Sequence, residues 1–588
     1  MIDFDFKTER IPEKLKALQR KTSTLGIFRL ITFFGMGALL VLGIAENPFW
    51  LIPAVLSVGG FIRLIQKTNM LKDQEELYLA LIKINENQGL RQTRNLENLD
   101  SGLEFSDKNH PFSSDLDLFG AHSLFQLLNH TSSQNGKNQL ADLIKSPFDP
   151  ESAQSRSRAV LELSQKNEFL DSMEAIGLAF QKDEKPADTW VKWLAKEEKS
   201  GVLNLILAFL GPLGGILGLV LVLLGMLPEA VLGIWIIAGV GLLSRVFVPL
   251  KEAAASIPSG PTLKSYRLRS RQIERETFTS PALCLEKGIF ETTESNISSQ
   301  LNQLDRLGLW AQNRMNLLYL PINLLFWTDF FLFIQLANWK QKVGSSLGQL
   351  PKNLEKWEVW VSLGAFESQL EGSGKVHWLA EVSLSAKDLT HPLIPPRTAI
   401  PNAIDFDPDH RLVILTGANM SGKTTFMRTL GINCVLANLG LSPFGTSLSL
   451  GPVQLYTSMR NSDNLGESVS SFYAELSRIN HLIERLEAGE PIFFLLDEIL
   501  KGTNTQDRIS GSEALIRQIL QTNGLGIIST HDIELSELEQ SVEKVHNFSF
   551  HSEIQDQFID FDYKIKKGPC PSFNAHKLME LMGIRFQN

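Results

Sequence analysis

The segment Leu412-Val-Ile-Leu-Thr-Gly-Ala-Asn-Met-Ser-Gly-Lys-Thr424 decides the fold of the C-terminal part of the chain. An apolar run leads directly into the pattern G-x-x-x-x-G-K-T, which predicts a buried strand followed by a phosphate-binding loop. Backbone N–H groups can point at phosphate oxygens, Lys423 supplies a mobile catalytic charge, and the Thr424 hydroxyl can bind Mg²⁺. The predicted nucleotide ligands are Gly417, Ala418, Asn419, Met420, Ser421, Gly422, Lys423, Thr424 and Thr425.

Two further apolar runs end in residues that suit phosphoryl transfer. Residues 491–496 precede Asp497 and Glu498, and residues 525–530 precede His531. One acid can hold Mg²⁺ while the next orients or deprotonates a water molecule, so Asp497 is the predicted metal ligand and Glu498 the catalytic base. His531 can sense the γ-phosphate or position the water. Because the carboxyl ends of parallel strands converge on one ligand, we expect an open α/β sheet that hydrolyses a nucleotide.

The residues around these motifs resemble the MutS family of DNA mismatch-repair ATPases. Residues 416–428 are similar to the family's T-G-P-N-M-G-G-K-S-T-Y-M-R, and residues 497–507 to its D-E-x-G-R-G-T-S-T-x-D. Residues 470–475 are similar to its S-T-F-x-x-E. The resemblance implies that the nucleotide is ATP and that residues 386–588 form a P-loop ATPase domain, a mostly parallel sheet with helices on both faces.

The resemblance also implies further site residues and a partner. His391 and Pro392 echo the family's H-P-L lead-in to the ATPase domain, so they are expected at the nucleotide. In the family two ATPase domains pack face to face, and the serine of S-T-F approaches the γ-phosphate of the opposite subunit. Ser470, with Ser471 beside it, takes that place here. We therefore expect a homodimer.

The chain departs from the family's pattern at two places. Ile499, Leu500 and Lys501 stand where the family usually has a glycine and an arginine, and Asn504 replaces a serine. Both changes fall on the expected subunit interface. They leave the residues expected to bind Mg²⁺ and ATP unchanged.

The resemblance continues upstream. Residues 115–140 resemble the start of the family's core, and residues 360–366 resemble the segment where its lever arm returns to the ATPase domain. We therefore expect an all-α core and lever domain over residues 111–385. Ordinary amphipathic helices are the alternative, because any core helix shows Leu and Phe at this spacing. No Phe-x-Glu wedge precedes the core, so a mismatch-reading domain of the family's usual kind is not expected.

Long uncharged stretches predict transmembrane helices, since about twenty apolar residues cross a bilayer. Together they predict hairpins at residues 25–66 and 201–249, the second of which interrupts the core domain. Buried core helices are the alternative for the shorter second and fourth stretches. A fifth stretch, residues 315–339, contains a proline, an asparagine and an aspartate and is predicted as a buried or surface-lying core helix. The four predicted spans are residues 25–45, with Arg29 snorkelling, 49–62, 201–227 and 230–244.

Lysine and arginine flank both hairpins on one side. By the positive-inside rule, both chain ends and the ATPase domain are expected in the cytoplasm, with the spans in the inner or plasma membrane of a bacterium. Residues 1–24 are then a cytoplasmic segment and residues 67–110 a helix and linker. No cleavage site typical of a signal peptide precedes the second span.

Composition gives weaker indications of the binding partner and the cellular compartment. A formal net charge of −9 gives no overall attraction for nucleic acid, whose binding depends largely on phosphate neutralisation. The basic stretch 264–271 is a candidate contact for phosphates or lipid head groups, and a solvated helix face is the alternative. The 3 cysteines have no metal-site spacing and fit a reducing compartment.

Three functions fit these patterns. The first is a membrane-anchored ATPase of this family that hydrolyses ATP at a dimeric site and couples hydrolysis to DNA binding. The second is an ABC-type transporter, or a membrane-remodelling or signalling ATPase, that does not bind DNA; no L-S-G-G-Q precedes Asp497, which argues against the transporter. The third is a scaffold with ATP as a structural ligand, in which Glu498 would be superfluous. The first is preferred.

Overall fold

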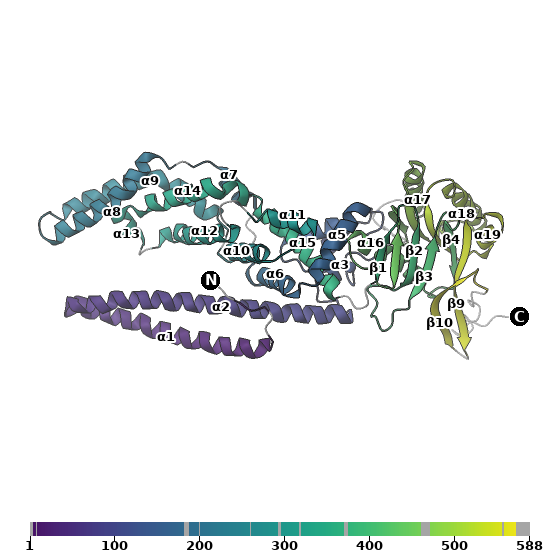
Figure 1. Cartoon of the computed structure of the whole chain (residues 1–588), viewed down its shortest axis with the longest axis horizontal. Coiled ribbons are helices and arrows are strands. Elements are labelled where there is room, and N and C mark those ends of the chain that lie inside the picture. The colour runs from purple at the N-terminus through teal and green to yellow at the C-terminus, as the bar shows by residue number, and fades with distance from the viewer. Residues whose placement is uncertain are drawn as a thin grey trace. The chain divides into compact units, whose positions relative to one another are not determined.

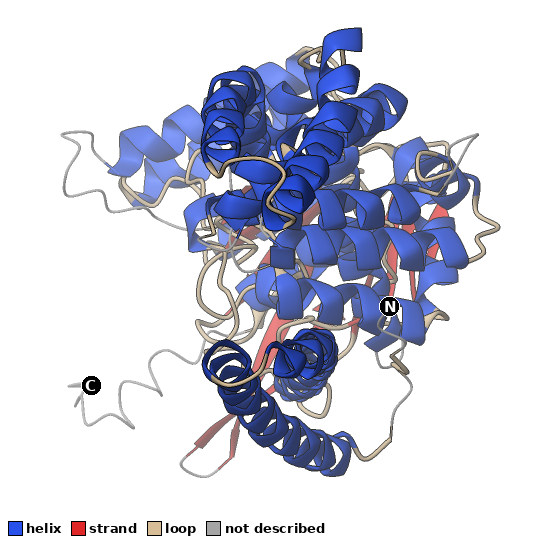
Figure 2. Cartoon of the chain, turned by 90° about the vertical axis from the view of Figure 1, so that its left-hand side faces the viewer, coloured by secondary structure: helices blue, strands red, loops and turns tan. Residues whose placement is uncertain are grey.

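The chain forms two compact units. The computed structural model describes residues 4–6, 9–181, 187–198, 200–258, 260–291, 296–316, 319–369, 374–459, 471–555 and 558–571. A helical unit comprises residues 1–86, 131–136 and 166–361, and a sheet unit comprises residues 87–130, 137–165 and 362–588. Every strand in the described ranges belongs to the sheet unit (Figures 1 and 2). The expected order, helical part first and α/β part last, is confirmed.

The sheet unit is built on a six-stranded sheet with the strand order β10-β9-β4-β8-β7-β6. Five of the strands are parallel and β10 is antiparallel to β9. The expected mostly parallel sheet is therefore confirmed. Strands β4, β7 and β8 are apolar and buried along almost their whole length, as strands covered on both faces are. The strands are β4 Leu412–Gly417, β6 Gln454–Ser458, β7 Ile492–Asp497, β8 Leu525–Thr530, β9 Val545–Gln555 and β10 Phe558–Lys567.

Helices cover both faces of this sheet. On one face, Leu482 of α17 (Ser471–Glu487) and Ile516 of α18 (Thr505–Ile519) share a buried core with Phe494 of β7. On the other face, α16 (Lys423–Asn438) packs closely, because a Cβ atom at Gly431 would lie 3.3 Å from the Leu495 side chain. Successive residues of a strand point to opposite faces, so Phe494 and Leu495 fix the two layers. Short helices α19 Leu538–Ser541 and η4 Ile533–Glu537 follow β8.

A second sheet of four strands, in the order β1-β5-β2-β3, was not expected from the sequence. Strand β2 is antiparallel to both of its neighbours, and β1 is parallel to β5. These strands are only four to six residues long, so the alternation of more and less buried residues in β2 and β5 spans too few residues to stand out in the sequence. Their bounds are β1 Lys375–Trp378, β2 Leu384–Leu389, β3 Asn402–Phe406 and β5 Ser447–Leu450.

The remaining described elements are helices. Helices α2 and α15 each continue from the helical unit into the sheet unit. The helices are α1 Ile11–Ala45, η1 Pro48–Trp50, α2 Leu51–Thr93, η2 Leu103–Phe105, α3 Leu124–Leu128, α4 Gln134–Ile144, α5 Pro150–Ser164, α6 Asn167–Phe180, α7 Ala187–Ala195, α8 Val202–Leu223, α9 Ala230–Ser256, α10 Gly260–Arg275, α11 Pro281–Gly288, α12 Ile297–Gln312, η3 Asn313–Met315, α13 Tyr319–Phe326, α14 Thr328–Leu347 and α15 Leu350–Gln369.

The basic stretch on α10 is used inside the helical unit. Arg269 is buried and its Nη1 lies 2.6 Å from Oε1 of Glu358. Burial acts to raise the pKa of Glu358, but Arg269 and the Ser133 hydroxyl outweigh it, so the pKa lies below its usual value. Lys264 pairs with Asp73 at 2.7 Å and Arg267 with Asp305 at 3.1 Å. The charges of these three cations are therefore balanced by acids of the same unit.

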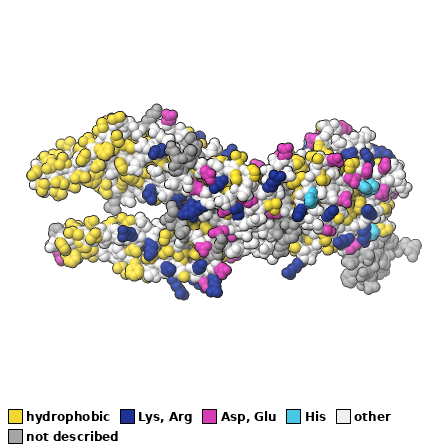
Figure 3. Space-filling model, viewed as in Figure 1, with side chains coloured by type: hydrophobic (Ala, Val, Ile, Leu, Met, Phe, Trp, Pro, Cys, Tyr) yellow, Lys and Arg dark blue, Asp and Glu magenta, His cyan; other side chains and the backbone are white. Residues whose placement is uncertain are grey.

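Four helices, α1, α2, α8 and α9, are long and apolar enough to cross a membrane, by length and composition. Most of the side chains in their apolar stretches are exposed, among them Phe34 and Phe209. Figure 3 shows a mostly yellow, hydrophobic surface over the α8–α9 hairpin and a more broken one over α1 and α2. Exposed apolar patches of this extent mark a membrane or protein interaction surface.

The fifth apolar stretch is not one helix, and the prediction of a single core helix over residues 315–339 was wrong. It forms α13 and α14, bent by 88° at Trp327, whose φ is 51°. The side chain of Asn323 accepts a hydrogen bond from the Asp329 backbone N–H at 2.9 Å, which satisfies one free N–H at the start of α14. The Trp327 ring stacks on Trp235 of α9 with 4.3 Å between ring centroids. A local cap and an aromatic stack therefore fix the bend.

Candidate nucleotide site

The phosphate-binding loop connects β4 to α16. Gly417 and Gly422 have φ values of 150° and 107°, and Met420, between them, is exposed with a φ of 67°. Glycine takes such angles without the steric cost that a side chain brings. A Cβ atom at Gly417 would also lie 2.8 Å from the carbonyl oxygen of Phe550. Both glycines are therefore required by the local backbone.

Lys423 is buried under this loop. Its Nζ donates to the carbonyl oxygens of Gly417 at 2.7 Å and Ala418 at 3.1 Å. Burial lowers the pKa of Lys423, while the carboxylates of Glu498 and Asp497 act to raise it. The ammonium group is thus held by the loop carbonyl oxygens, and the two acids at the end of β7 add a favourable electrostatic effect.

Thr424 and Asp497 are neighbours at the carboxyl ends of β4 and β7. Thr424 Oγ1 donates to Asp497 Oδ2 at 2.6 Å, and Ser529 donates to the other carboxylate oxygen, Oδ1. A hydroxyl and a carboxylate are oxygen ligands of the kind that Mg²⁺ prefers together with nucleotide phosphates. Ser529 was missed from the sequence. Its contact with Asp497 depends on the β7–β8 register, in which the two residues lie directly opposite each other.

Glu498 lies between the imidazole of His531 and the ammonium group of Lys501. Its Oε1 is 2.7 Å from His531 Nε2, and its Oε2 is 2.7 Å from Lys501 Nζ. The close contact with His531 is the main reason that the pKa of Glu498 falls to about 2; burial opposes the fall and Lys501 adds to it. Glu498 is therefore ionised at neutral pH. An ionised carboxylate can accept a hydrogen bond from a water molecule and thereby orient it.

The loop after Glu498 is held by α17. Leu500 has a φ of 60°, a conformation that costs a residue with a side chain about 1 kcal/mol or more. The Leu500 N–H donates to the carboxylate of Glu475, and the Leu500 side chain is buried in the core shared with α17 and α18. A Cβ atom at Gly502 would lie 2.6 Å from the Phe472 Cβ atom. The start of α17 and this loop therefore fit closely together.

Asn504, where the family has serine, caps α18. Its side-chain oxygen accepts a hydrogen bond from the Asp507 backbone N–H at 2.9 Å. Asparagine and serine are about equally good at this helix position. The departure from the family's pattern at Asn504 therefore keeps the local structure.

His391 lines a cavity of about 190 Å³ beside the loop. Burial is the main reason that the pKa of His391 falls to about 4, so the ring is neutral at pH 7. The aromatic ring of Tyr563 also lines the cavity and can stack on a planar ring. The Asn402 amide, in the same wall, donates to the carbonyl oxygen of Tyr563 and accepts from the Ile565 N–H. Gly422 and Thr425 connect the cavity to the phosphate-binding loop.

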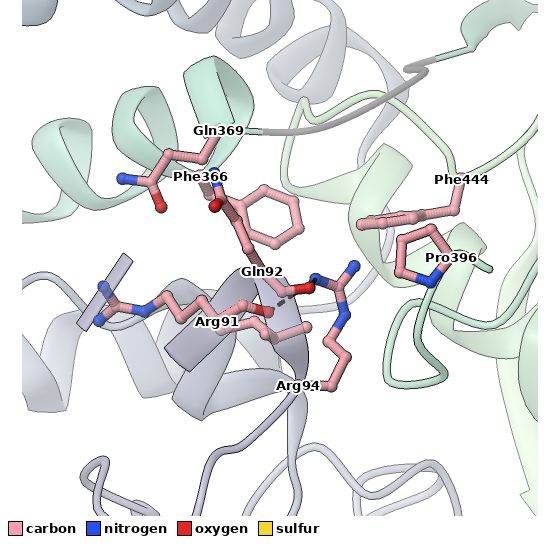
Figure 4. A pocket seen from close by; sticks show the side chains of 8 residues that line it. Arg91, Gln92, Arg94, Phe366, Gln369, Pro396 and Phe444 are labelled. Carbon is pink, nitrogen blue, oxygen red and sulfur yellow. Dashed lines mark hydrogen bonds between the residues drawn. The ribbon is translucent and has the colours of Figure 1, made fainter. Parts of the chain in front are cut away.

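Pro392 is not among the residues that line this cavity. Its carbonyl oxygen accepts a hydrogen bond from Arg94 Nε at 2.7 Å. The Arg94 guanidinium lies 5.7 Å from the centre of the Phe444 ring, in the wall of a second, small pocket of about 40 Å³ (Figure 4). Pro392 thus helps to hold the segment that carries His391.

The remaining predicted ligands have different outcomes. Asn419 is exposed on the loop, Ser421 is buried in it, and Thr425 is exposed in the first turn of α16. Ser470 lies outside the described residues. Ser471 is the first residue of α17, and its side chain is also outside the description.

Comparison with known proteins finds a matching family model and relatives that share one name. Residues 413–584 match the family model for MutS domain V. The chain is 26% identical over 311 residues to the DNA mismatch repair protein MutS of Acetivibrio thermocellus, covering 51% of this chain and 34% of that protein. It is 31% identical over 209 residues to the protein of the same name from Fusobacterium nucleatum subsp. nucleatum, covering 35% and 23%. The chain thus matches only about a third or less of the length of these relatives.

Proposed function

Because this chain belongs to the MutS family, we propose that it binds ATP and hydrolyses it with the help of Mg²⁺. The observation that carries the proposal is the convergence of Lys423, the Thr424–Asp497 pair and the Glu498–His531 pair at the ends of β4, β7 and β8. A loop lysine, oxygen ligands for Mg²⁺ and a residue that positions the water recur in enzymes that transfer a phosphoryl group to water.

Each residue has a role that follows from its contacts. Thr424 and Asp497 would hold Mg²⁺, which supplies positive charge to the phosphate oxygens. Lys423 would add a second positive charge from beneath the loop. Glu498 would orient the attacking water, and His531 would hold the carboxylate in place through the 2.7 Å contact. The cavity beside the loop, with His391 and Tyr563 in its wall, would take the base or ribose.

Phosphate release by the purified protein tests this activity. Lys423→Ala removes the loop cation and should lower ATP turnover at least about 100-fold. Lys544→Ala, which removes an exposed lysine from the same unit, is the matched control and should keep wild-type turnover. Equal activity of Lys423→Ala and the control would reject the site.

We further propose that two copies of the chain form the working ATPase, with Ser470 or Ser471 reaching the nucleotide of the opposite subunit. The support is the family membership and the close fit between the start of α17 and the loop after Glu498. An inactive Ser470→Ala protein mixed with an inactive Lys423→Ala protein should regain part of the activity, because one intact site forms in each mixed dimer. No recovery would argue against a shared site.

We propose that α1 with α2, and α8 with α9, anchor the chain as two transmembrane hairpins, with the ATPase domain in the bacterial cytoplasm. Their lengths and exposed apolar side chains support this. Membranes washed with alkaline carbonate should retain the protein. Its release into the wash would contradict the anchoring.

The partner moved by ATP hydrolysis is proposed to be DNA, as the names of the relatives suggest. A membrane-remodelling or signalling ATPase is the second candidate, favoured by the net charge of −9 and by the pairing of the α10 cations with acids. Binding to matched and mismatched duplexes across a salt series separates them. Salt-sensitive binding supports DNA, whereas its absence favours the second candidate.

A further inference from the structure

The helical unit contains a cavity of about 600 Å³ that the ATPase proposal does not use. It lies beside the segment that joins α7 to α8 and beside the end of α14. Its volume is within the usual range for small-molecule sites. The lining residues are Val191, Leu194, Ala195, Lys196, Glu197, Glu198, Lys340, Gln341, Gly348 and Gln349.

Two buried groups of opposite charge stand in its wall. The side chains of Lys340 and Glu198 are only 4% and 9% exposed, and Nζ and Oε1 lie 3.7 Å apart, too far for a hydrogen bond. Within the described part of the chain, neither of these two atoms has another hydrogen-bond partner. The ammonium group also lies 4.7 Å from the centre of the Trp193 ring. Both groups therefore keep hydrogen-bonding capacity that burial makes costly to leave unused.

The cavity lies at the foot of the α8–α9 hairpin. Helix α8 begins at Val202, a few residues after Glu198, and Lys196 forms an ion pair with Glu252 in the last part of α9. In Figure 3, charged side chains replace the hydrophobic surface at the foot of this hairpin. If the hairpin crosses a membrane as proposed above, the cavity lies at the level of the lipid head groups.

We propose that this cavity binds the head group of a phospholipid that carries both a phosphate and a primary amine. Lys340 donates to the phosphate oxygens, and Glu198 accepts a hydrogen bond from the ammonium group. A head group with a phosphate alone would meet the carboxylates of Glu197 and Glu198, and a quaternary amine has no N–H for Glu198. The site rests on the proposed membrane anchoring and adds a lipid specificity to it.

Lipid analysis of the purified protein tests the site. Full-length protein is extracted in mild detergent from mixed vesicles of phosphatidylethanolamine, phosphatidylglycerol and phosphatidylcholine, and the bound lipids are measured by mass spectrometry. We expect wild type to retain phosphatidylethanolamine about tenfold over the other two lipids. Lys340→Met and Glu198→Gln should each abolish the preference. Lys342→Met, which removes an exposed lysine two residues away on α14, should keep it.

The outcomes separate this inference from the anchoring. Protein that does not enter the vesicles contradicts the hairpins. Anchored wild-type protein with no lipid preference, or with the same preference in Lys340→Met as in wild type, overturns the head-group site alone. If Lys340→Met does not fold, Lys340→Arg and Glu198→Gln decide: the first should keep the preference and the second lose it. Added soluble phosphoethanolamine should not displace the lipid, and full displacement would overturn the membrane source of the ligand.

Discussion

Glu498 Oε1 lies 2.7 Å from His531 Nε2, across the ends of two neighbouring parallel strands. This contact joins the acid that follows β7 to the imidazole that follows β8. It gives the carboxylate a fixed direction and a pKa of about 2.

The Glu498–His531 contact predicts a pH-dependent contribution to stability. The folded-state pKa of Glu498 lies below its ordinary value of 4.5, so the contribution is present above pH 4.5 and is lost as pH falls towards 2. Replacing His531 with Gln should remove most of it, at most about 3 kcal/mol at pH 7. Urea unfolding should show a larger difference in stability between wild type and His531→Gln at pH 7 than at pH 3, because part of the contribution is already lost at pH 3. His377→Gln is the control, and an equal gap between wild type and His531→Gln at both pH values would contradict the prediction.

The left-handed backbone of Leu500 predicts that glycine is more stable than alanine at this position, the reverse of the usual order. At ordinary positions Gly is less stable than Ala by about 0.5–1 kcal/mol, but a φ of 60° reverses this preference. Leu500→Gly should therefore unfold at higher urea concentration than Leu500→Ala, although both lose the buried side chain. At Leu476, on α17, the Gly variant should be the less stable one. If Leu500→Ala is more stable than Leu500→Gly, the fold does not impose the left-handed conformation at this position.

Ser529 predicts a change in the Mg²⁺ requirement. It donates to Oδ1 of Asp497, and groups that orient a metal ligand typically change metal affinity 10–100-fold. Ser529→Ala should raise the Mg²⁺ concentration for half-maximal ATP turnover about tenfold. Ser510→Ala, on the exposed surface of α18, should leave it unchanged. The same Mg²⁺ titration for both variants would show that Ser529 does not orient Asp497.

The Asn504 cap predicts a graded series. Asn504→Ala should lower the free energy of unfolding by about 1 kcal/mol, because the Asp507 N–H loses its acceptor, whereas Asn504→Ser should change it little. Thermal melting measures both. A serine variant as unstable as the alanine variant would contradict the capping role.

The main features of the ATPase fold followed from local sequence. The apolar runs that became β4, β7 and β8 were recognisable because a fully buried parallel strand is apolar on both faces. The position of Lys423, Thr424, Asp497, Glu498 and His531 at the strand ends followed from the same runs. Their contacts needed only the parallel order of the strands.

Other features depended on contacts between distant residues. The role of Ser529 comes from the strand register, and the bend at Trp327 comes from the Asn323 cap and the stack on Trp235. The pairing of Arg269 with Glu358 joins α10 to α15 and cannot be read from the basic stretch alone. The cavity at Lys340 likewise brings together residues 191–198, which precede the α8–α9 hairpin in the sequence, and residues 340–349, which follow it.

The central claim is that Glu498 orients the water that attacks ATP. The most direct measurement is a comparison of nucleotide binding with single-turnover hydrolysis in Glu498→Gln, with Glu543→Gln as the surface control. We predict that Glu498→Gln binds ATP as wild type does and hydrolyses it at least about 100-fold more slowly. Hydrolysis by Glu498→Gln at the rate of the control would contradict the claim.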